Sequence, residues 1–188
     1  MKRLLFIPLL LALTLQFASA AEYIVDASHS HVSFSIKHMM ISNVKGEFKS
    51  FEAEIDFDAS SKKFNKLSSS IDVSSIDTGI TKRDEHLKSA DFFDIEKYAT
   101  INFVATKISE NKIVGNLTIH GVTKEIELTP TIHGVIKDFQ GNNRVGFSLE
   151  GKLNRTDFGL TWNKMLESGG IVVGEDVKIT VDIEAIEL

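Results

Sequence analysis

The strictest pattern in the chain is a two-residue alternation from residue 144 to residue 154. Polar side chains hold one set of alternate positions, and the other set is Val145, Phe147, Leu149, Gly151 and Leu153. Because successive side chains of a strand point to opposite faces, this period predicts a long strand with one buried and one wet face. The pattern stops at Arg155, and the next residues include Asp157 and the single tryptophan, Trp162. A strand whose polar and aromatic residues gather at one end suggests a scaffold that is open at that end, and we call this open end the mouth.

About eight segments of this kind follow one another at hairpin spacing, with no alternation of strands and long helices between them. Their apolar residues fall within 32–36, 44–57, 67–73, 101–105, 113–119, 126–136, 145–153 and 177–185. Closing such a sheet on itself removes its exposed edges, so we expect a closed antiparallel barrel. A two-sheet sandwich is the alternative, because it gives the same strand signals.

A change of phase interrupts the second of these strands. Phe48 is apolar at an even position, whereas Ile55 and Phe57 are apolar at odd positions. One extra residue near Lys49 and Ser50, as in a β-bulge, would re-aim the strand so that both sets face inward.

One helix is expected, over residues 81–90. Thr81 and Asp84 have the spacing of a capping box, which places the helix start at Thr81. The segment is too polar for a core helix. We therefore expect a surface helix or lid, which docks through Leu87, Phe92 and Phe93.

The N-terminal residues 1–20 have the features of a secretory signal peptide. Lys2 and Arg3 precede an apolar run that ends in Ala18-Ser19-Ala20, a small-residue cleavage site. We expect cleavage after Ala20, which leaves residues 21–188 as a single domain. An uncleaved N-terminal anchor is the alternative, although the run is short for a stable transmembrane helix.

Charge and cysteine content narrow the classes of partner. The chain has 21 Lys and Arg against 26 Asp and Glu, a formal net charge of −5. Nucleic acid is not expected as a partner, because phosphate contacts need clustered cations, and anionic membrane surfaces are disfavoured for the same reason. The chain has no cysteine, which excludes disulfides, thiolate metal sites and a cysteine nucleophile.

Four groups of residues resemble the YceI-like family, in the family's order and across nearly all of residues 21–188. The first is Asp26-Ala-Ser-His29-Ser30-x-Val32-x-Phe34-x-Ile36-x-His38, followed by Val44-x-Gly46-x-Phe48. The second is Thr81-x-Arg83-Asp84-x-His86-Leu87, followed by Asp91-Phe92-Phe93-Asp94. The others are Gly115-x-Leu117-Thr118-Ile119-His120-Gly121-Val122-Thr123-Lys124 and Asn154-Arg155-x-Asp157-Phe158-Gly159-Leu160. Two places depart from the pattern, since a glycine is expected near Ala53 or Glu54 and a proline at Ala99.

This resemblance implies an all-β fold, an extended eight-stranded antiparallel lipocalin-like barrel with one short surface helix, in the bacterial periplasm. It implies a carrier or storage protein that holds a polyisoprenoid or fatty-acyl chain inside the barrel, with a link to envelope stress in some members. No catalytic residue, metal or cofactor is expected. The sequence leaves open the ligand's length and head group, the choice between transport, storage and sequestration, and whether the chain forms a homodimer.

The residues expected to contact such a ligand lie mainly on the inward phase of the strands. They are Val32, Phe34, Ile36, His38, Phe48, Phe92, Phe103, Leu117, Phe147, Leu149, Arg155, Asp157, Phe158 and Trp162. A close-packed core is the alternative interpretation, since an eight-stranded barrel can be filled by side chains or can admit one small ligand. Small inward residues favour a tunnel because they leave volume unfilled; these are Ser69, Ala105, Gly115 and Gly151. The mouth is expected where residues 155–163 meet residues 81–93.

Two pairs of polar residues have both a structural and a functional interpretation. Arg83-Asp84 and Arg155-x-Asp157 either contact the polar part of a ligand or form ion pairs that tie the helix and the 155–163 loop to the barrel. His29-x-His31 would place two imidazoles on one strand face, a spacing that zinc can use. Hydrogen bonds at a strand end are the simpler interpretation of these histidines, so no metal site is predicted.

Three functions fit the barrel. The first is a binding protein for a long-chain amphiphile, and the second is an enzyme that modifies such a lipid through His86, Arg83, Asp157 or His38. The third is an outer-membrane barrel, which would need girdles of Tyr and Trp. The chain has two Tyr and one Trp, so stable membrane insertion is not expected. No nucleophile or metal set favours the enzyme, and the binding protein is the prediction.

Overall fold

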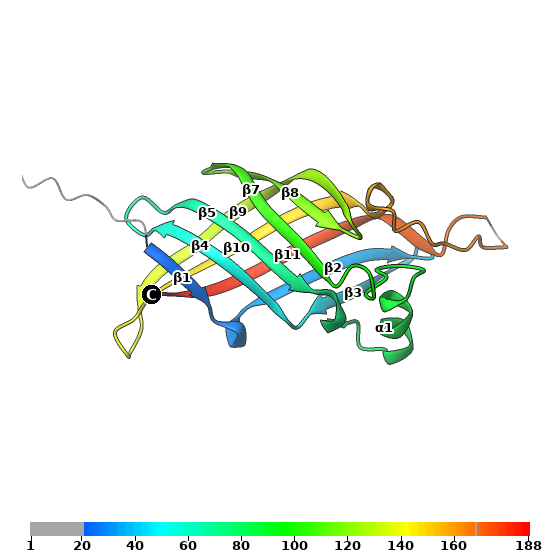
Figure 1. Cartoon of the computed structure of the whole chain (residues 1–188), viewed down its shortest axis with the longest axis horizontal. Coiled ribbons are helices and arrows are strands. Elements are labelled where there is room, and N and C mark those ends of the chain that lie inside the picture. Colours follow the sequence, from blue (N-terminus) through cyan, green and yellow to red (C-terminus); the bar gives the residue numbers. More distant parts are fainter. Residues whose placement is uncertain (1–20, 168) are drawn as a thin grey trace, which may run out of the picture.

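The computed structural model describes residues 21–167 and 169–188, which form an elongated β-structure (Figure 1). The expected signal peptide, residues 1–20, lies outside the described residues. The strands are β1 (Ala21–Val25), β2 (His31–His38), β3 (Ser42–Phe48), β4 (Phe51–Asp58), β5 (Lys63–Asp72), β6 (Ile76–Asp77), β7 (Thr100–Ser109), β8 (Lys112–Ile119), β9 (Val122–Lys137), β10 (Asn143–Asn154) and β11 (Val173–Glu187). The helical segments are α1 (Thr81–Lys88) and the 3₁₀ turns η1 (Ala27–His29), η2 (Val73–Ser75) and η3 (Arg155–Phe158).

The sheet closes because its first and last strands pair with each other. β1 pairs with the end of β11, where Val25 lies opposite Ala185, and with β4 on its other side. Three barrel strands are each interrupted once, as β1 then β2, β3 then β4, and β5 then β6. With these interruptions bridged, the described residues form a closed barrel of eight antiparallel strands with one helix. The barrel expected from the sequence is therefore confirmed, and the two-sheet sandwich is excluded.

The interruption between β3 and β4 explains the change of phase at Phe48. β3 pairs with β2 and β6, whereas β4 pairs with β1 and β5. At the break, the N–H of Lys49 donates to the carbonyl of Ser75 (3.2 Å). Phe48, Ile55 and Phe57 are all buried although their positions differ in parity. Both phases therefore face the interior, as the sequence predicts.

The turn between β8 and β9 is formed by His120 and Gly121. Both residues have positive φ, 51° and 75°, which is the backbone geometry of a type I′ hairpin. A Cβ on Gly121 would lie 2.6 Å from Cε1 of Tyr98. Glycine is therefore favoured here by the backbone and by the close approach of the tyrosine ring.

One end of the barrel is a solid core. Tyr23, Phe57, Phe64 and Phe147 form a continuous series of ring contacts, with centroid separations of 6.0, 5.1 and 4.8 Å. All four residues are buried, and tilted or edge-to-face ring pairs add to the stabilisation from apolar burial. They come from β1, β4, β5 and β10, and the C-terminus marks this end of the molecule in Figure 1.

The helix α1 lies toward the opposite end of the barrel (Figure 1). It starts at Thr81 as expected but ends at Lys88. The capping-box prediction is wrong, because Ile80 is the N-cap residue and makes no side-chain hydrogen bond. Asp84 instead accepts hydrogen bonds from the backbone N–H and the hydroxyl of Thr78 (2.9 and 2.5 Å). In the part of the chain that the structure describes, no helix is long and apolar enough to cross a membrane.

Candidate ligand-binding cavity

A cavity of about 360 Å³ lies inside the barrel, between the solid core and α1. This volume is within the range of small-molecule sites, roughly 300–1,000 Å³. The wall is mostly apolar and is built from inward-facing strand residues. The predicted contact residues that line it are Val32, Phe34, Ile36, His38, Phe48, Phe92, Phe103, Leu117, Phe147, Leu149, Arg155 and Trp162. The barrel interior is therefore a cavity above a solid floor, rather than a core packed along its whole length.

The burial of inward residues changes along the barrel axis. Phe147, at the floor, is 1% exposed, and Ile113, below the cavity, is 0% exposed. Phe34, Ile36 and Ile179 face the cavity and are only partly buried. The difference arises because these upper side chains have open space in front of them, instead of a partner from the opposite wall.

Strand β11 supplies a strip of wall that was missing from the predicted contacts. Val177, Ile179 and Val181 line the cavity, and they pair across the ladder with Ile36, Phe34 and Val32. The signal was present, because this strand alternates as β10 does. Other wall residues missed in the same way are Phe51, Leu67, Ile71 and Ile101.

The glycines predicted to open the tunnel do not do so. A Cβ on Gly115 would lie 2.4 Å from the Phe103 ring, and one on Gly151 would lie 2.5 Å from Leu128. A larger side chain from the neighbouring strand thus folds over each glycine and fills the vacated volume. Of the four small residues, Ser69 lines the cavity, whereas Ala105, Gly115 and Gly151 do not.

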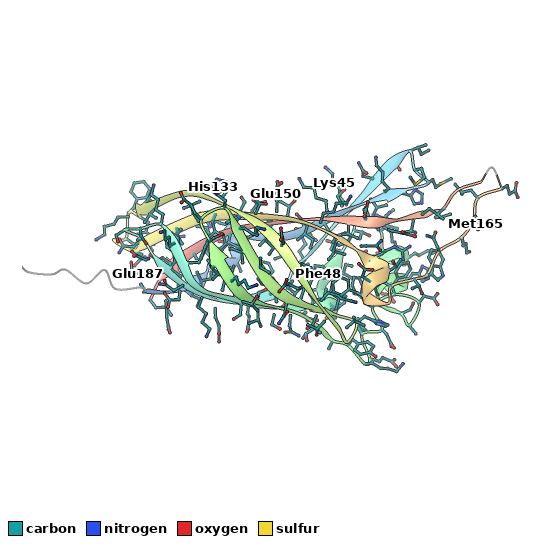
Figure 2. The ribbon with its side chains drawn as sticks, turned by 90° about the horizontal axis from the view of Figure 1, so that it is seen from above. Lys45, Phe48, His133, Glu150, Met165 and Glu187 are labelled. Carbon is teal, nitrogen blue, oxygen red and sulfur yellow. The ribbon has the colours of Figure 1, made fainter. Side chains whose placement is uncertain are left out.

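Aromatic residues gather where α1 meets the segment after η3. The Trp162 ring lies 4.8 Å from the His86 ring and 5.2 Å from the Phe92 ring, centroid to centroid. Nε2 of His86 lies 2.9 Å from a carboxylate oxygen of Asp91. Trp162 and His86 both line the cavity, and the His86 side chain is also 38% exposed, so the cavity wall meets the outer surface at this end. The structure brings residues 155–163 and 81–93 together at this opening, as predicted. In Figure 2, Met165 of the following loop lies at the end of the molecule opposite Glu187.

Hydrogen bonds rather than ion pairs join Arg83 and Asp84 of α1 to the connection that precedes the helix. Nε of Arg83 donates to the Thr78 hydroxyl and Nη2 donates to the Thr78 carbonyl, both at 2.7 Å. Thr78 also donates to Asp84, so one threonine organises both charged residues. Leu87 and Phe93 pack against the core from this region, as expected for a docked surface helix. Among the described residues, Arg83 makes no salt bridge, and it lines the cavity.

Arg155 is a buried cation that binds backbone carbonyls. It is 3% exposed. Its Nε donates to Gly174 O (2.8 Å), Nη2 donates to Val173 O (3.3 Å), and Nη1 donates to Leu160 O. Desolvation by burial lowers the pKa of the Arg155 guanidinium. The alternative of an ion pair that ties the 155–163 loop to the barrel is wrong for Arg155, because its guanidinium binds carbonyl oxygens instead.

Asp157 and Phe158 are the predicted contacts that the cavity does not include. Asp157 is exposed, whereas Phe158 is 1% exposed within the core. Both lie in η3, where the strand alternation ends and the side chains turn away from the period-two phase. Asp157 was also one of the four candidate groups of the enzyme alternative, and it does not lie on the cavity wall.

His29 and His31 do not share a strand face. His29 lies in η1, and β2 begins only at His31. Nδ1 of His29 lies 3.0 Å from Asp26, and His31 lies 3.6 Å from Glu47. A zinc site shared by the two histidines is therefore not formed. The hydrogen bond to Asp26 fits the simpler interpretation.

A charge network that the sequence did not predict surrounds Arg144. Its guanidinium contacts Asp26 (2.8 Å), Asp138 (2.8 Å) and Glu184 (2.6 Å). Asp26, His29 and Glu184 have ligand atoms within 4.8 Å of one another, but Arg144 already neutralises the two carboxylates. Hydrogen bonds from Ser28, His29 and Arg144 hold the pKa of Asp26 well below its ordinary value. Hydrogen bonding to Arg144 lowers the pKa of Asp138 to about 2.

An antiparallel barrel of eight strands with an apolar cavity open at one end has the lipocalin-like architecture. A comparison with protein families matches residues 23–185 to the YceI-like domain. The chain therefore belongs to the YceI-like family.

Relatives and solved structures agree with this assignment. A UPF0312 protein of Staphylococcus aureus strain MSSA476 is 39% identical over 160 residues, which cover 85% of this chain and 94% of the relative. The crystal structure of a Campylobacter jejuni YCEI protein is 40% identical, with a TM-score of 0.70, and the match covers 81% of this chain and 90% of that one. A structure titled as a polyisoprenoid binding domain from Saccharophagus degradans has a TM-score of 0.68 at 15% identity, covering 90% of this chain and 100% of that one. At that identity it supports the fold alone.

Proposed function

We propose that this protein is a periplasmic binding or carrier protein, which holds a long-chain apolar or amphiphilic ligand of polyisoprenoid or fatty-acyl type inside the barrel. The ligand's tail runs along the apolar wall towards Phe147, and its polar end stays near α1 and Trp162. In this proposal the barrel binds its ligand without changing it chemically.

The single observation that carries the proposal is the cavity itself. Its wall is mostly apolar, its floor is closed by Phe147, and at the α1 end it is bounded by Trp162 and the partly exposed His86. Each Å² of apolar surface removed from water contributes roughly 25 cal/mol, so a chain that fills this space is held mainly by the hydrophobic effect. The one-ended opening favours a ligand with an apolar tail and a distinct head.

Two further points support the proposal. The Saccharophagus degradans protein of the same fold is titled a polyisoprenoid binding domain, which agrees with a long apolar ligand. The signal-peptide features of residues 1–20 support export to the periplasm.

A matched pair of substitutions on β8 tests the ligand site. Leu117 lines the cavity, whereas Ile113, on the same inward face, lies in the solid core. We expect Leu117→Phe to occupy empty space and to reduce uptake of a fluorescent long-chain fatty acid by delipidated protein at least tenfold. Ile113→Phe should overpack the core, lower the free energy of unfolding by ~1–3 kcal/mol and leave uptake unchanged.

The two variants separate ligand binding from stability. Equal uptake by Leu117→Phe and the parent would contradict the proposal, provided that the variant's circular dichroism and unfolding midpoint are those of a folded protein. Lack of uptake by the parent itself would contradict it as well.

A further inference from the structure

The charged side chains on the cavity wall are all basic. They are Lys37, Arg83 and Arg155, and two histidines, His38 and His86, accompany them. Within residues 21–167 and 169–188, no Asp or Glu lines the cavity. The chain as a whole has more acidic than basic residues, 26 against 21. The sign of the charge on the wall is therefore opposite to that of the protein.

Three of these residues form one neighbourhood around the start of β11. Arg155 donates to the carbonyls of Val173 and Gly174. Val173 lies opposite His38 in the ladder, and a Cβ on Gly174 would lie 3.0 Å from Cβ of Lys37. Lys37, His38 and Arg155 therefore lie at the same end of the barrel.

The other two residues extend this neighbourhood through α1. Arg83 and His86 are three positions apart, so they lie on one face of the helix. His86 contacts Trp162, and Trp162 lies two residues after Leu160, whose carbonyl binds Arg155. All five residues therefore lie at the same end of the cavity, and the apolar floor at Phe147 lies away from them.

Arg155 and Arg144 are two poorly exposed cations with different surroundings. Arg144 contacts three carboxylates within 2.8 Å. Arg155 is more deeply buried, yet no carboxylate of a described residue lies within ion-pair distance of it, and Glu175 acts on it only through a longer-range charge interaction. A guanidinium has five N–H donors, and the carbonyls of Leu160, Val173 and Gly174 each take one. A buried charge without a counter-ion is costly, and these three carbonyls leave two of the five donors without an acceptor among the described residues.

We propose that the ligand carries an anionic head group, a carboxylate or a phosphate monoester, which binds at the opening of the cavity among Arg155, Arg83 and Lys37. This inference rests on the proposed binding function and specifies its ligand class. The head group supplies the negative charge that the wall lacks.

The chemistry of the opening fits such a head group. Guanidinium donors match the geometry of carboxylate and phosphate oxygens, and charge-assisted hydrogen bonds are about twice as strong as neutral ones. The site is partly removed from water, so its charges are screened less than those on the outer surface. An alcohol or ester of the same chain length would bury the same tail but would leave the cations without a counter-ion.

A series of ligands with one tail and different heads tests the proposal. The probes are palmitate, hexadecyl phosphate and 1-hexadecanol, titrated into delipidated full-length mature protein by displacement of a fluorescent fatty acid. We expect palmitate, hexadecyl phosphate or both to bind at least tenfold more tightly than the alcohol. The two anionic probes distinguish a fatty-acid head from a phosphorylated one.

Charge-removing variants identify the residues that recognise the head. The measured quantity is the dissociation constant of 1-hexadecanol divided by that of the anionic probe, within one variant. A substitution that only loosens the loop or the helix weakens the binding of both probes equally, so it leaves this ratio unchanged. Arg155→Gln and the double variant Lys37→Gln/Arg83→Gln should each reduce this ratio at least threefold. Lys178→Gln removes the same charge from the exposed outer face of β11 and should leave the ratio unchanged. If Arg155→Gln does not fold, the double variant gives the same test.

The outcomes separate this inference from the proposed function. Equal affinity for the alcohol and both anions would overturn the anionic head group while leaving a lipid-binding barrel intact. A ratio that is unchanged in both Arg155→Gln and Lys37→Gln/Arg83→Gln would also overturn the anionic head group. Failure of all three probes and of the fluorescent fatty acid to bind would overturn the proposed function itself.

Discussion

The rings of Trp162 and His86 meet almost at a right angle, with an interplanar angle of 87° and centroids 4.8 Å apart. This contact joins the segment after η3 to the helix α1 at the opening of the cavity. Trp162 is the single tryptophan of the chain, so its emission reports on this place alone. The ring is partly exposed, and its environment should change when a ligand covers the opening.

Addition of palmitate to delipidated protein should shift the Trp162 emission to the blue. The reason is that the bound ligand displaces water from the indole, whose apolar ring faces the cavity. The measurement is a fluorescence titration, with the Leu117→Phe variant as a control that retains Trp162 but binds weakly. Tight binding of palmitate with an unmoved spectrum would show that the ligand enters elsewhere.

The contact between Gly115 and Phe103 predicts a substitution that acts on stability and binding together. Gly115→Ala would place a Cβ 2.4 Å from the Phe103 ring and push that ring towards the cavity. We expect a loss of ~1–3 kcal/mol in the free energy of unfolding, as for other overpacked sites, together with weaker uptake of the fluorescent fatty acid. Chemical denaturation and the uptake assay measure the two effects.

Gly134→Ala is the matched control for this substitution. Gly134 also lies in a strand, and a Cβ there would meet no atom within 4 Å. It should therefore leave uptake unchanged and stability nearly so. A Gly115→Ala protein that behaved like Gly134→Ala would contradict the packing of Phe103 over Gly115.

The Arg144 network predicts how stability changes in acid. The folded protein lowers the pKa of Asp138 from 3.8 to about 2, and it lowers that of Asp26 as well. A lowered folded pKa gives stability that is present above the unfolded pKa and is lost as pH falls through the folded value. The free energy of unfolding should therefore fall between about pH 4 and pH 2.

Arg144→Gln tests the source of this dependence. Without the guanidinium, the folded pKa values of Asp138 and Asp26 should rise towards their ordinary values, and the acid-dependent loss between pH 4 and pH 2 should become shallower. Lys152→Gln is a control, since its ion pair with Asp176 is exposed. Urea unfolding at a series of pH values measures the free energy of unfolding of each protein. If that free energy changed with pH in the same way for Arg144→Gln and the parent, the result would contradict the network.

The proposed export makes a prediction about the mature chain. Protein recovered from the periplasm should begin at Ala21, because Ala18-Ser19-Ala20 is the expected cleavage site. Intact-mass measurement resolves this directly. A mass that retains residues 1–20 would contradict the cleaved signal peptide.

The sequence predicted the barrel and part of the cavity wall for one physical reason. The period of two is imposed by the strand backbone, so Phe34, Leu117 and Phe147 could be assigned to one face without knowledge of their neighbours. The rule could not be applied to Asp157 and Phe158, because the alternation ends before them at η3.

Contacts that depend on tertiary approach could not be predicted in this way. The glycines appeared as empty volume in the sequence, yet Phe103 fills the space at Gly115. One expected role of Arg155 was an ion pair that fastens its loop, whereas its partners include the carbonyls of Val173 and Gly174. These carbonyls lie at the start of β11, whose position depends on closure of the whole barrel.

Mass spectrometry of an organic extract of the purified periplasmic protein tests the central claim most directly. The account predicts a long-chain amphiphile with an acidic head, recovered in near-stoichiometric amount from the parent protein and depleted in Leu117→Phe. Extraction should also leave the barrel able to rebind palmitate. An extract without any long-chain molecule, from protein that then fails to bind palmitate or hexadecyl phosphate, would contradict the account.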